Sequence, residues 1–162
     1  MNAYEGRSTP TLTTRTPPCT LLLEVPVLRQ WFYVSSANVE SVAEVQRIIR
    51  VSRDRNAAHS VTGLLVYSGD HFAQVIEGPP GALDTIIASI RRDARHQIIW
   101  ERLLTDIRDR WFGDWSMGYI YNDSLETLLR RVDQDGGLPA LDELVPTLLR
   151  HLVVNARSRT RA

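Results

Sequence analysis

Cysteine is almost absent from this chain of 162 residues, in which Cys19 is the only one. A single thiol cannot form an intrachain disulfide or supply a cysteine-based zinc site. His59 and His71 do not stand at the spacing of metal ligands either. The sequence therefore predicts neither a disulfide framework nor a metal centre.

The chain also lacks an excess of charge and a long apolar run. Its 19 Lys and Arg residues balance its 19 Asp and Glu residues, whereas a general nucleic-acid binder carries a basic footprint. No apolar run reaches the ~18 residues that cross a bilayer. Glu24 and Pro26 interrupt "TLLLEVPVL", which argues against a secretory signal. We expect a cytoplasmic protein that binds neither nucleic acid nor membrane.

No internal repeat and no Rossmann or P-loop glycine pattern occurs in the chain. Residues 1–29 form an N-terminal lead-in, rich in Thr and Pro at its start, that we expect to be flexible. From residue 30 the pattern becomes regular, and "QWFYVSSA" predicts a strand. Residues 38–58 then predict a helix with Asn38 as its N-cap. Its buried stripe is expected to contain Val42, Val45, Ile49 and Ser52.

The pattern up to residue 121 predicts a hairpin, a second helix and two more strands. "VTGLLVY" and "HFAQVIE" flank the turn "SGD", "ALDTIIASIRRD" has helical spacing, and "HQIIWERLLTDI" and "WSMGYIY" are typical of strands. In the last strand we expect Trp115, Met117 and Tyr119 on one face. The order β-α-β-β-α-β-β predicts an α+β, ferredoxin-like domain over residues 30–121, with a mixed sheet and both helices on one face.

Residues 122–162 predict a C-terminal helical extension that ends in a basic tail. Asp123 and Glu126 resemble a capping pair, and a leucine-rich segment follows whose apolar residues share one helical face. Pro146 lies inside that segment and is expected to kink or split the helix, because an interior proline costs about 3 kcal/mol. The apolar face is compatible with cover for the open face of the sheet and with an interface in a homo-oligomer, and both remain open.

Gln74 is unusual, because alternation in "HFAQVIE" places its amide between Phe72 and Ile76 on what looks like a core face. A buried amide needs partners for its carbonyl and N–H groups, or it costs roughly 1–3 kcal/mol per unpaired group. The first and third strands of a ferredoxin-like sheet are neighbours, so Tyr33 can meet Gln74.

The two predicted helices carry similar residues toward their C-terminal ends. The first aligns Ile48, Ser52 and Asn56 on one face, and the second reaches Ile90 before Arg95 and His96. Two interpretations stay open from the residues alone. One is a satisfied polar core, and the other is a pocket for a flat, hydrogen-bonding ligand between the helices.

Four motifs together carry a resemblance to a known family: "FYVSSA", "NAAHSVTGLLVYSGDHFAQVIEGP", "RRDARH" and "RWFGDWSMGY". In this order and spacing they resemble the BLUF family, the sensors of blue light using FAD, over about residues 30–121. The resemblance implies a flavin between the two helices, either FAD or FMN or riboflavin in its place. The residues that it implies for the cofactor site are Tyr33, Ile48, Ser52, Asn56, Gln74, Ile90, Arg95 and His96. The photoactive residues that it implies are Tyr33, Gln74, Trp115 and Met117.

The mechanism that this resemblance implies is photochemical and not enzymatic. Tyr33 would donate an electron to the excited flavin and Gln74 would relay a proton, and the radical pair would then recombine without net chemistry. Gln74 would end rotated or tautomerised with a stronger bond to the flavin C4 carbonyl. The absorption then shifts slightly to the red until dark recovery. Glutamine suits this role because its amide has a donor end and an acceptor end, so its reversal rewires the network without moving charge.

No appended catalytic or DNA-binding domain is visible, so the output is expected to pass to a separate protein. Candidates are a cyclic-dinucleotide phosphodiesterase, a transcription regulator or a response-regulator-like protein. An acylphosphatase-like hydrolase on the same fold would need an arginine after the first strand, and "SSANVES" has none. The stronger rival is a ligand-binding or oligomerisation module without photochemistry.

Overall fold

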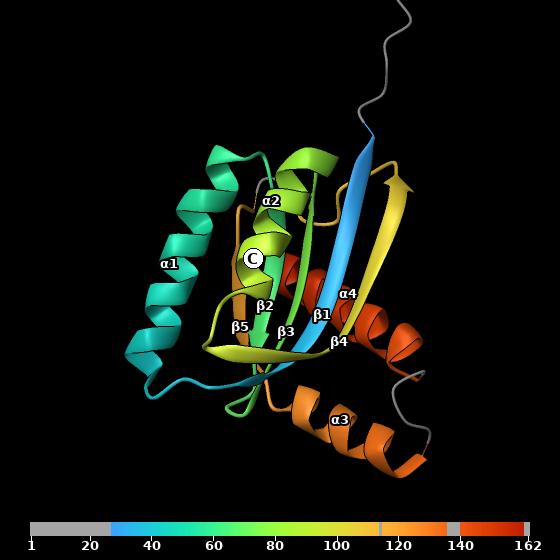
Figure 1. Cartoon of the computed structure of the whole chain (residues 1–162). Helices are drawn as coiled ribbons and strands as arrows, with labels where there is room; N and C mark the ends of the chain where they lie inside the picture. The colour runs from blue at the N-terminus through green and yellow to red at the C-terminus, as the bar shows by residue number, and fades with distance from the viewer. Residues whose placement is uncertain (1–26, 114, 136–139, 161–162) are drawn as a thin grey trace, which may run out of the picture.

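The computed structural model describes residues 27–113, 115–135 and 140–160. Within them one five-stranded sheet separates α1 and α2 on its near face from α4 behind it, with α3 at one end (Figure 1). The strands are β1 (Leu28–Ala37), β2 (Thr62–Tyr67), β3 (His71–Gly78), β4 (His96–Ile107) and β5 (Gly118–Tyr121). The helices are α1 (Val42–Ala58), α2 (Pro80–Arg91), α3 (Ser124–Asp135) and α4 (Leu141–Thr160).

The sheet has the strand order β4-β1-β3-β2-β5. Strand β2 runs parallel to β5, and the other neighbouring pairs are antiparallel. This mixed sheet with its β-α-β-β-α-β-β order confirms the predicted α+β, ferredoxin-like fold. The register places Tyr33 of β1 directly opposite Gln74 of β3, as the neighbouring first and third strands predicted.

Each face of the sheet has its own apolar core, because successive strand residues point to opposite faces. On the face under α1 and α2, the buried residues include Trp31, Tyr33, Val45, Ile49, Leu65, Ile76, Leu83 and Ile86. On the other face, α3 and α4 bury Leu125, Leu141, Val145, Leu149 and Val153 against Phe32, Val34, Val66 and Val75. The predicted cover for the open face of the sheet is confirmed, and Leu144, expected within the apolar stripe, is 39% exposed.

Helix α1 begins later than the sequence predicted. Its N-cap is Ser41, whose hydroxyl accepts the backbone N–H of Glu44 at 3.3 Å. Asn38 lies in the preceding connection and donates instead to the carbonyl of Ala94. As a consequence Val42 is the first helical residue and is 68% exposed, so its predicted place in the buried stripe is wrong.

Helix α4 contains Pro146 and is not split by it. Proline lacks the N–H that would bond the carbonyl four residues earlier, which here belongs to Asp142. Arg102 of β4 donates its Nη1–H to that carbonyl at 2.7 Å, and Trp100 donates to the Asp142 carboxylate at 3.2 Å. The predicted split is therefore wrong, because β4 supplies the missing donor.

Helix α3 is attached to the hairpin of β2 and β3 by Glu126. Its carboxylate contacts the His71 ring nitrogen Nδ1 at 2.9 Å and accepts the Ser68 hydroxyl at 3.4 Å. The capping pair predicted from Asp123 and Glu126 stays a prediction beside this contact with the hairpin. This contact joins the extension to the strand that carries Gln74.

The predicted lead-in, residues 1–29, lies outside the described residues except at its end, where β1 already begins at Leu28. In the described part of the C-terminal extension, the helix continues to Thr160. None of the helices within the described ranges has the length and apolar character that crossing a bilayer requires.

Candidate functional site

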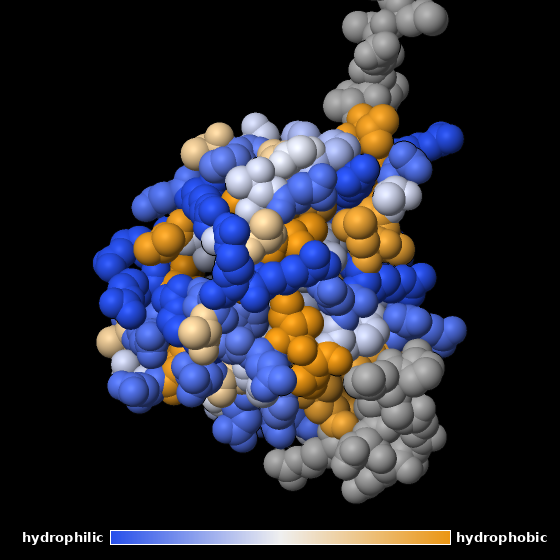
Figure 2. Space-filling view, in the orientation of Figure 1, coloured by the Kyte–Doolittle hydropathy of each residue, from blue (hydrophilic) through white to orange (hydrophobic). Residues whose placement is uncertain are grey.

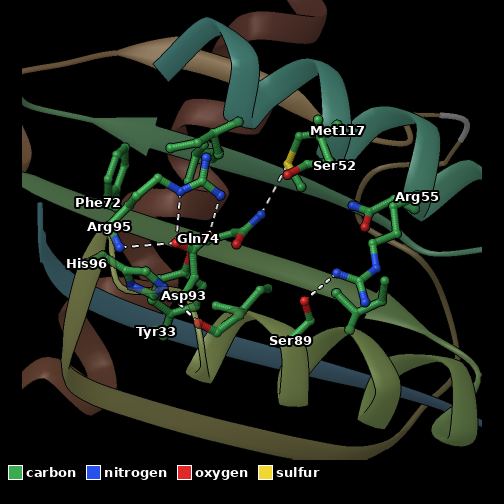
Figure 3. Close-up of a pocket in the computed structure, with 16 residues that line it drawn as sticks. Tyr33, Ser52, Arg55, Phe72, Gln74, Ser89, Asp93, Arg95, His96 and Met117 are labelled. Atoms are coloured by element: carbon green, nitrogen blue, oxygen red, sulfur yellow. Dashed lines mark hydrogen bonds and ion pairs between the residues drawn. The ribbon is translucent and has the colours of Figure 1, made fainter. Parts of the chain in front are cut away.

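A cavity lies between α1 and α2, above the sheet (Figure 3). It encloses about 770 Å³ of space including its open mouth. Helix α1 contributes Ile48 and Asn56 to its walls, and α2 contributes Ile86 and Ile90. The surrounding face of the molecule is mostly hydrophilic with apolar patches (Figure 2). The cavity thus combines apolar walls with a few polar groups, as small-molecule sites do.

The cavity brings together every residue predicted for the cofactor site. They come from five different elements and the turn after α2, and all of them line its wall: Tyr33, Ile48, Ser52, Asn56, Gln74, Ile90, Arg95 and His96. Their proximity follows from the ferredoxin-like topology, which places β1 and β3 side by side beneath the two helices.

Tyr33 and Gln74 are both buried at the cavity, with 5% and 3% of their surfaces exposed. Gln74 donates its Nε2–H to the sulfur of Met117 at 3.3 Å. Among the described residues, the Gln74 carbonyl and the Tyr33 hydroxyl have no hydrogen-bond partner. Burial raises the pKa of Tyr33 above its usual range, and the nearby Asp93 carboxylate adds to this effect. The phenol therefore stays protonated at neutral pH, and both side chains have polar groups to offer a ligand.

The His96 ring also has an unpaired group at the cavity. Its Nε2 lies 2.9 Å from the Ile90 carbonyl, an arrangement in which the ring donates Nε2–H and leaves Nδ1 as an acceptor. Within the described residues the buried Nδ1 has no partner. Such an atom normally carries a cost, so it fits a cavity built for a molecule with hydrogen-bond donors.

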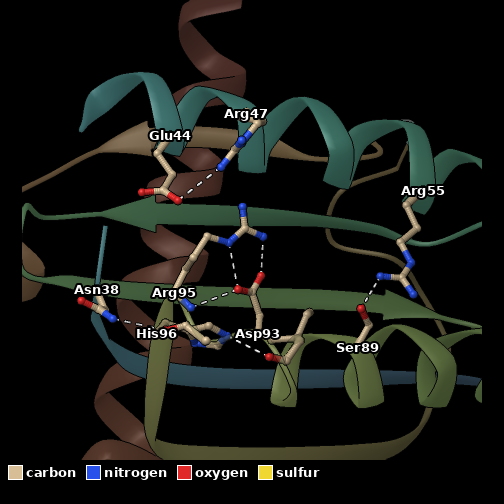
Figure 4. A network of polar contacts seen from close by, with 10 residues as sticks. Asn38, Glu44, Arg47, Arg55, Ser89, Asp93, Arg95 and His96 are labelled. Carbon is tan, nitrogen blue, oxygen red and sulfur yellow. Dashed lines mark hydrogen bonds and ion pairs between the residues drawn. The ribbon is translucent and has the colours of Figure 1, made fainter. Parts of the chain in front are cut away.

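Two arginines stand at opposite ends of the cavity in Figure 3. Arg95 pairs with Asp93, with Nε donating to Oδ1 at 2.8 Å, and this hydrogen bond lowers the pKa of the Asp93 carboxyl. At the other end Arg55 of α1 donates to the Ser89 hydroxyl of α2. Figure 4 shows the two contacts, which lie well apart in the view.

The cofactor residues predicted from sequence omitted Asp93 and Ser89, which line the same cavity. Asp93 has a signal in the sequence, because it is the single acid among the basic residues of "RRDARH". Ser89 has none, since a serine on an amphipathic helix is ordinary.

Met117 and Trp115 were predicted on one face, and the structure separates them. Met117 packs in the core under α1 and α2, whereas Trp115 packs against the core on the α4 side. Both precede β5, so strict strand alternation does not apply there. A Cβ on Gly118 would lie 3.0 Å from the Trp115 ring, so the glycine lets that ring lie close to the strand. Trp115 does not line the cavity, and its photoactive role remains only a prediction.

Glu77 is the most deeply buried acid, with 0% exposure, and sequence reasoning gave it no role. Its carboxylate accepts the backbone N–H groups of Trp111 and Phe112 at 2.9 and 2.8 Å. Gln30 and Thr62 donate to it as well, at 3.1 and 2.9 Å. It thereby anchors the connection between β4 and β5, which carries Met117 to the cavity.

In the parts of the chain that the structure describes, no three His, Cys, Asp or Glu side chains form a group that could hold a metal ion. The fold and the cavity together suit a protein that binds a planar heteroaromatic group. Two isoleucines on facing helices suit the faces of such a ring, and buried amide, phenol and imidazole groups suit its polar edge.

The chain belongs to the BLUF family, described as sensors of blue-light using FAD, which matches residues 28–118. This range is more than half of the chain. The resemblance predicted from the motifs is confirmed, and the chain is a blue-light photoreceptor domain that uses FAD. The domain is a sensor and not itself an enzyme.

Relatives with known roles match the same region. The photoactivated adenylate cyclase subunit beta of Euglena gracilis is 34% identical over 110 residues, which cover 64% of this chain and 12% of that protein. The blue light- and temperature-regulated antirepressor BluF of Escherichia coli (strain K12) is 35% identical over 78 residues, or 48% of this chain and 19% of that protein. The match thus spans less than a fifth of either relative.

Solved structures show the same fold at similar identity. BlrB, a BLUF protein in its dark state, has a TM-score of 0.62 and 31% identity, with 82% of this chain and 98% of that chain covered. A bacterial light-regulated adenylyl cyclase has a TM-score of 0.56 and 29% identity, with coverage of 66% and 34%.

Proposed function

We propose that this chain converts blue light into a rearranged hydrogen-bond network around Gln74 and passes the change to a separate effector protein. The observation that carries the proposal is the direct pairing of Tyr33 with Gln74 across β1 and β3, at the cavity between α1 and α2. When bound, the flavin absorbs the blue light and supplies the electron acceptor. The chain's own residues then provide the electron, the proton path and the lasting change.

Tyr33 is the proposed donor. Because burial raises its pKa, the phenol is protonated and neutral before it gives up an electron. Loss of an electron makes a phenol strongly acidic, so its proton needs a neighbouring acceptor. The amide of Gln74, its register partner, supplies that acceptor.

Gln74 is the proposed switch, since its amide presents an acceptor at one end and a donor at the other. In this structure the donor end points to the Met117 sulfur. Reversal or tautomerisation of the amide exchanges donor and acceptor at the cavity without leaving a buried charge. A change of this kind persists because it ends in a new, satisfied network.

The flavin ring is proposed to lie between Ile48 and Ile90, with Asn56 at its pyrimidine edge. Asn56 is 2% exposed and donates Nδ2–H to the Ser116 carbonyl at 2.8 Å, so its own carbonyl remains for a ring N–H. Ser52 lines the same wall as Ile48. Arg95 and His96 are proposed to bind the ribityl and phosphate end, for FAD or for FMN or riboflavin in its place.

The output is proposed to leave through the helical extension, because α3 contacts the hairpin through Glu126 and α4 covers the far face of the sheet. The related antirepressor and cyclases carry light regulation into larger proteins. A transcription regulator and a nucleotide-handling enzyme such as a cyclic-dinucleotide phosphodiesterase are the proposed classes of effector. Self-association of the chain also stays a prediction.

The test is spectroscopic. The purified chain should be yellow, and blue light should shift its flavin absorption to the red until it recovers in the dark. Gln74→Leu, which keeps the volume but removes both polar ends, should retain flavin without the shift. A normal photocycle in this variant, or flavin-loaded protein that does not respond to light, would refute the switch. The latter result would favour the rival, a binding module without photochemistry.

A further inference from the structure

Three consecutive carbonyl groups just before β5 are all held by hydrogen bonds. The backbone N–H of Gly63 donates to Trp115 at 3.0 Å. Asn56 donates Nδ2–H to Ser116 at 2.8 Å, and Arg53 donates Nε–H to Met117 at 3.0 Å. Together these bonds fix the backbone of the segment that brings Met117 to the cavity.

Arg53 differs from Asn56 in its position relative to the cavity. Asn56 is buried and lines the cavity wall, whereas Arg53 is an exposed residue of α1 that does not line it. The carbonyl of Met117 is the hydrogen-bond acceptor that the structure gives the Arg53 side chain. The contact that the structure shows between the Arg53 side chain and the flavin site therefore runs through Met117.

Met117 in turn bears directly on the orientation of Gln74. Its sulfur accepts the Gln74 Nε2–H at 3.3 Å, and Met117 is only 4% exposed. A reversed amide would present its oxygen to that sulfur, and two acceptors do not bond each other. A sulfur held in place thus favours the present orientation of Gln74 over the reversed one.

We propose that Arg53 is a positioning residue of the photocycle: by holding the Met117 carbonyl, it keeps the sulfur against Gln74 and shortens the life of the light-induced state. This inference rests on the proposed function of Gln74 as the switch. It makes Arg53, which does not line the cavity, a determinant of the lifetime of the light-induced state. Arg53 bonds the backbone carbonyl of Met117 and not its side chain. It therefore holds position 117 in place whichever side chain stands there.

The experiment compares Arg53→Ala with Arg50→Ala in the full-length, flavin-loaded chain. Arg50 is an exposed arginine three residues earlier on α1, so its variant controls for the loss of charge. Loss of one hydrogen bond corresponds to roughly a fivefold change in a rate, and Arg53→Ala should slow dark recovery by about that factor. Arg50→Ala should recover at the wild-type rate. Arg53→Lys, which keeps a cationic donor, should restore most of the rate.

A second comparison separates positioning from a general effect on stability. In a Met117→Leu background the sulfur is gone, so Arg53→Ala should no longer change the recovery rate. Wild-type recovery in Arg53→Ala, equal slowing in Arg50→Ala, or unchanged slowing in the Met117→Leu background each overturns the inference. If Arg53→Ala does not fold, Arg53→Leu, which keeps apolar bulk but has no hydrogen-bond donor, is held to the same criteria. The inference can fail while the Gln74→Leu result still supports the switch, so the two failures are distinguishable.

Discussion

Arg102 of β4 donates a hydrogen bond to the carbonyl of Asp142, the carbonyl that Pro146 leaves without its helical partner. Helix α4 therefore tolerates a proline in its second turn because an arginine from the sheet replaces the missing N–H. The same contact fixes α4 against the edge strand, together with the bond from Trp100 to the Asp142 carboxylate. The attachment of the extension thus depends on a pair of residues far apart in the sequence.

Arg102→Ala is expected to lower the free energy of unfolding by about 1 kcal/mol, the typical net value of one hydrogen bond. The loss should be smaller in a Pro146→Ala background, because an alanine N–H at that position can bond the Asp142 carbonyl itself. Urea denaturation of the four variants measures this coupling. Equal losses in both backgrounds would show that Arg102 does not act through this carbonyl.

The buried carboxylate of Glu77 gives a second prediction on stability. Glu77→Gln exchanges one acceptor oxygen for an NH2 group, which cannot accept from the backbone N–H groups of Trp111 or Phe112. A buried unpaired donor costs about 1–3 kcal/mol, and the loss should appear in urea denaturation. Glu143→Gln, at an exposed position on α4, is the matched control and should change little. Similar stability in both variants would contradict the anchoring role of Glu77.

The pair of Asp93 and Arg95 predicts a dependence on pH. The hydrogen bond from Arg95 lowers the pKa of Asp93 in the folded state, whereas the carboxyl of the unfolded chain keeps a pKa of about 3.9. A carboxyl whose pKa is lower in the folded state stabilises the fold at any pH above its unfolded-state pKa. This contribution is lost as the pH falls through the folded-state pKa.

Asp93→Asn removes this titration, so its unfolding free energy should fall less steeply than that of the wild type below about pH 4. The measurement is urea denaturation from about pH 2.5 to about pH 6, a range that includes the unfolded pKa of the carboxyl and extends below it. Asp84→Asn, in an exposed pair with Arg29 at 3.4 Å, serves as the comparison. If the unfolding free energies of the wild type and Asp93→Asn fell in parallel in acid, the pair of Asp93 and Arg95 would not be the source of this pH dependence.

The sequence predicted the fold well because the fold depends on local patterns. Strand alternation and helical periodicity identified the seven elements of the domain, and their order placed Tyr33 beside Gln74. The residues of the cavity wall, such as Asn56 and Ile90, were instead implied by the motifs that resemble the BLUF family, because the residues alone left a satisfied polar core open as well. These features need no knowledge of contacts between distant segments.

The errors share a physical cause, which is a partner supplied from elsewhere in the chain. Asn38 was expected to cap α1 and instead donates to the carbonyl of Ala94, at the far side of α2 in the sequence. Pro146 was expected to kink or split α4, but the helix is not split, and Arg102 of β4 bonds the carbonyl that the proline leaves without its N–H partner. Trp115 was expected beside Met117, and the bonds that hold the segment before β5 turn it to the opposite face. None of these contacts has a signature in the local sequence.

The opposite placement of Trp115 leads to the last prediction, which concerns the electron donor. Tyr33 lines the cavity, and Trp115 packs on the α4 side of the sheet. Tyr33→Phe keeps the ring but removes the hydroxyl, and with it the proton that must leave with the electron. We expect this variant to bind flavin and to lose the red shift under blue light.

Trp115→Phe should keep the shift, because the indole lies outside the cavity and the phenol remains in place. Steady-state absorption of both variants before and after illumination makes the comparison, and bound flavin confirms that each is folded. A persistent red-shifted state in Tyr33→Phe that disappears in the Tyr33→Phe, Trp115→Phe double variant would show that the indole replaces the phenol. That result would mean that Trp115 reaches the cavity in an arrangement different from the one described, because its indole must then come close enough to donate an electron.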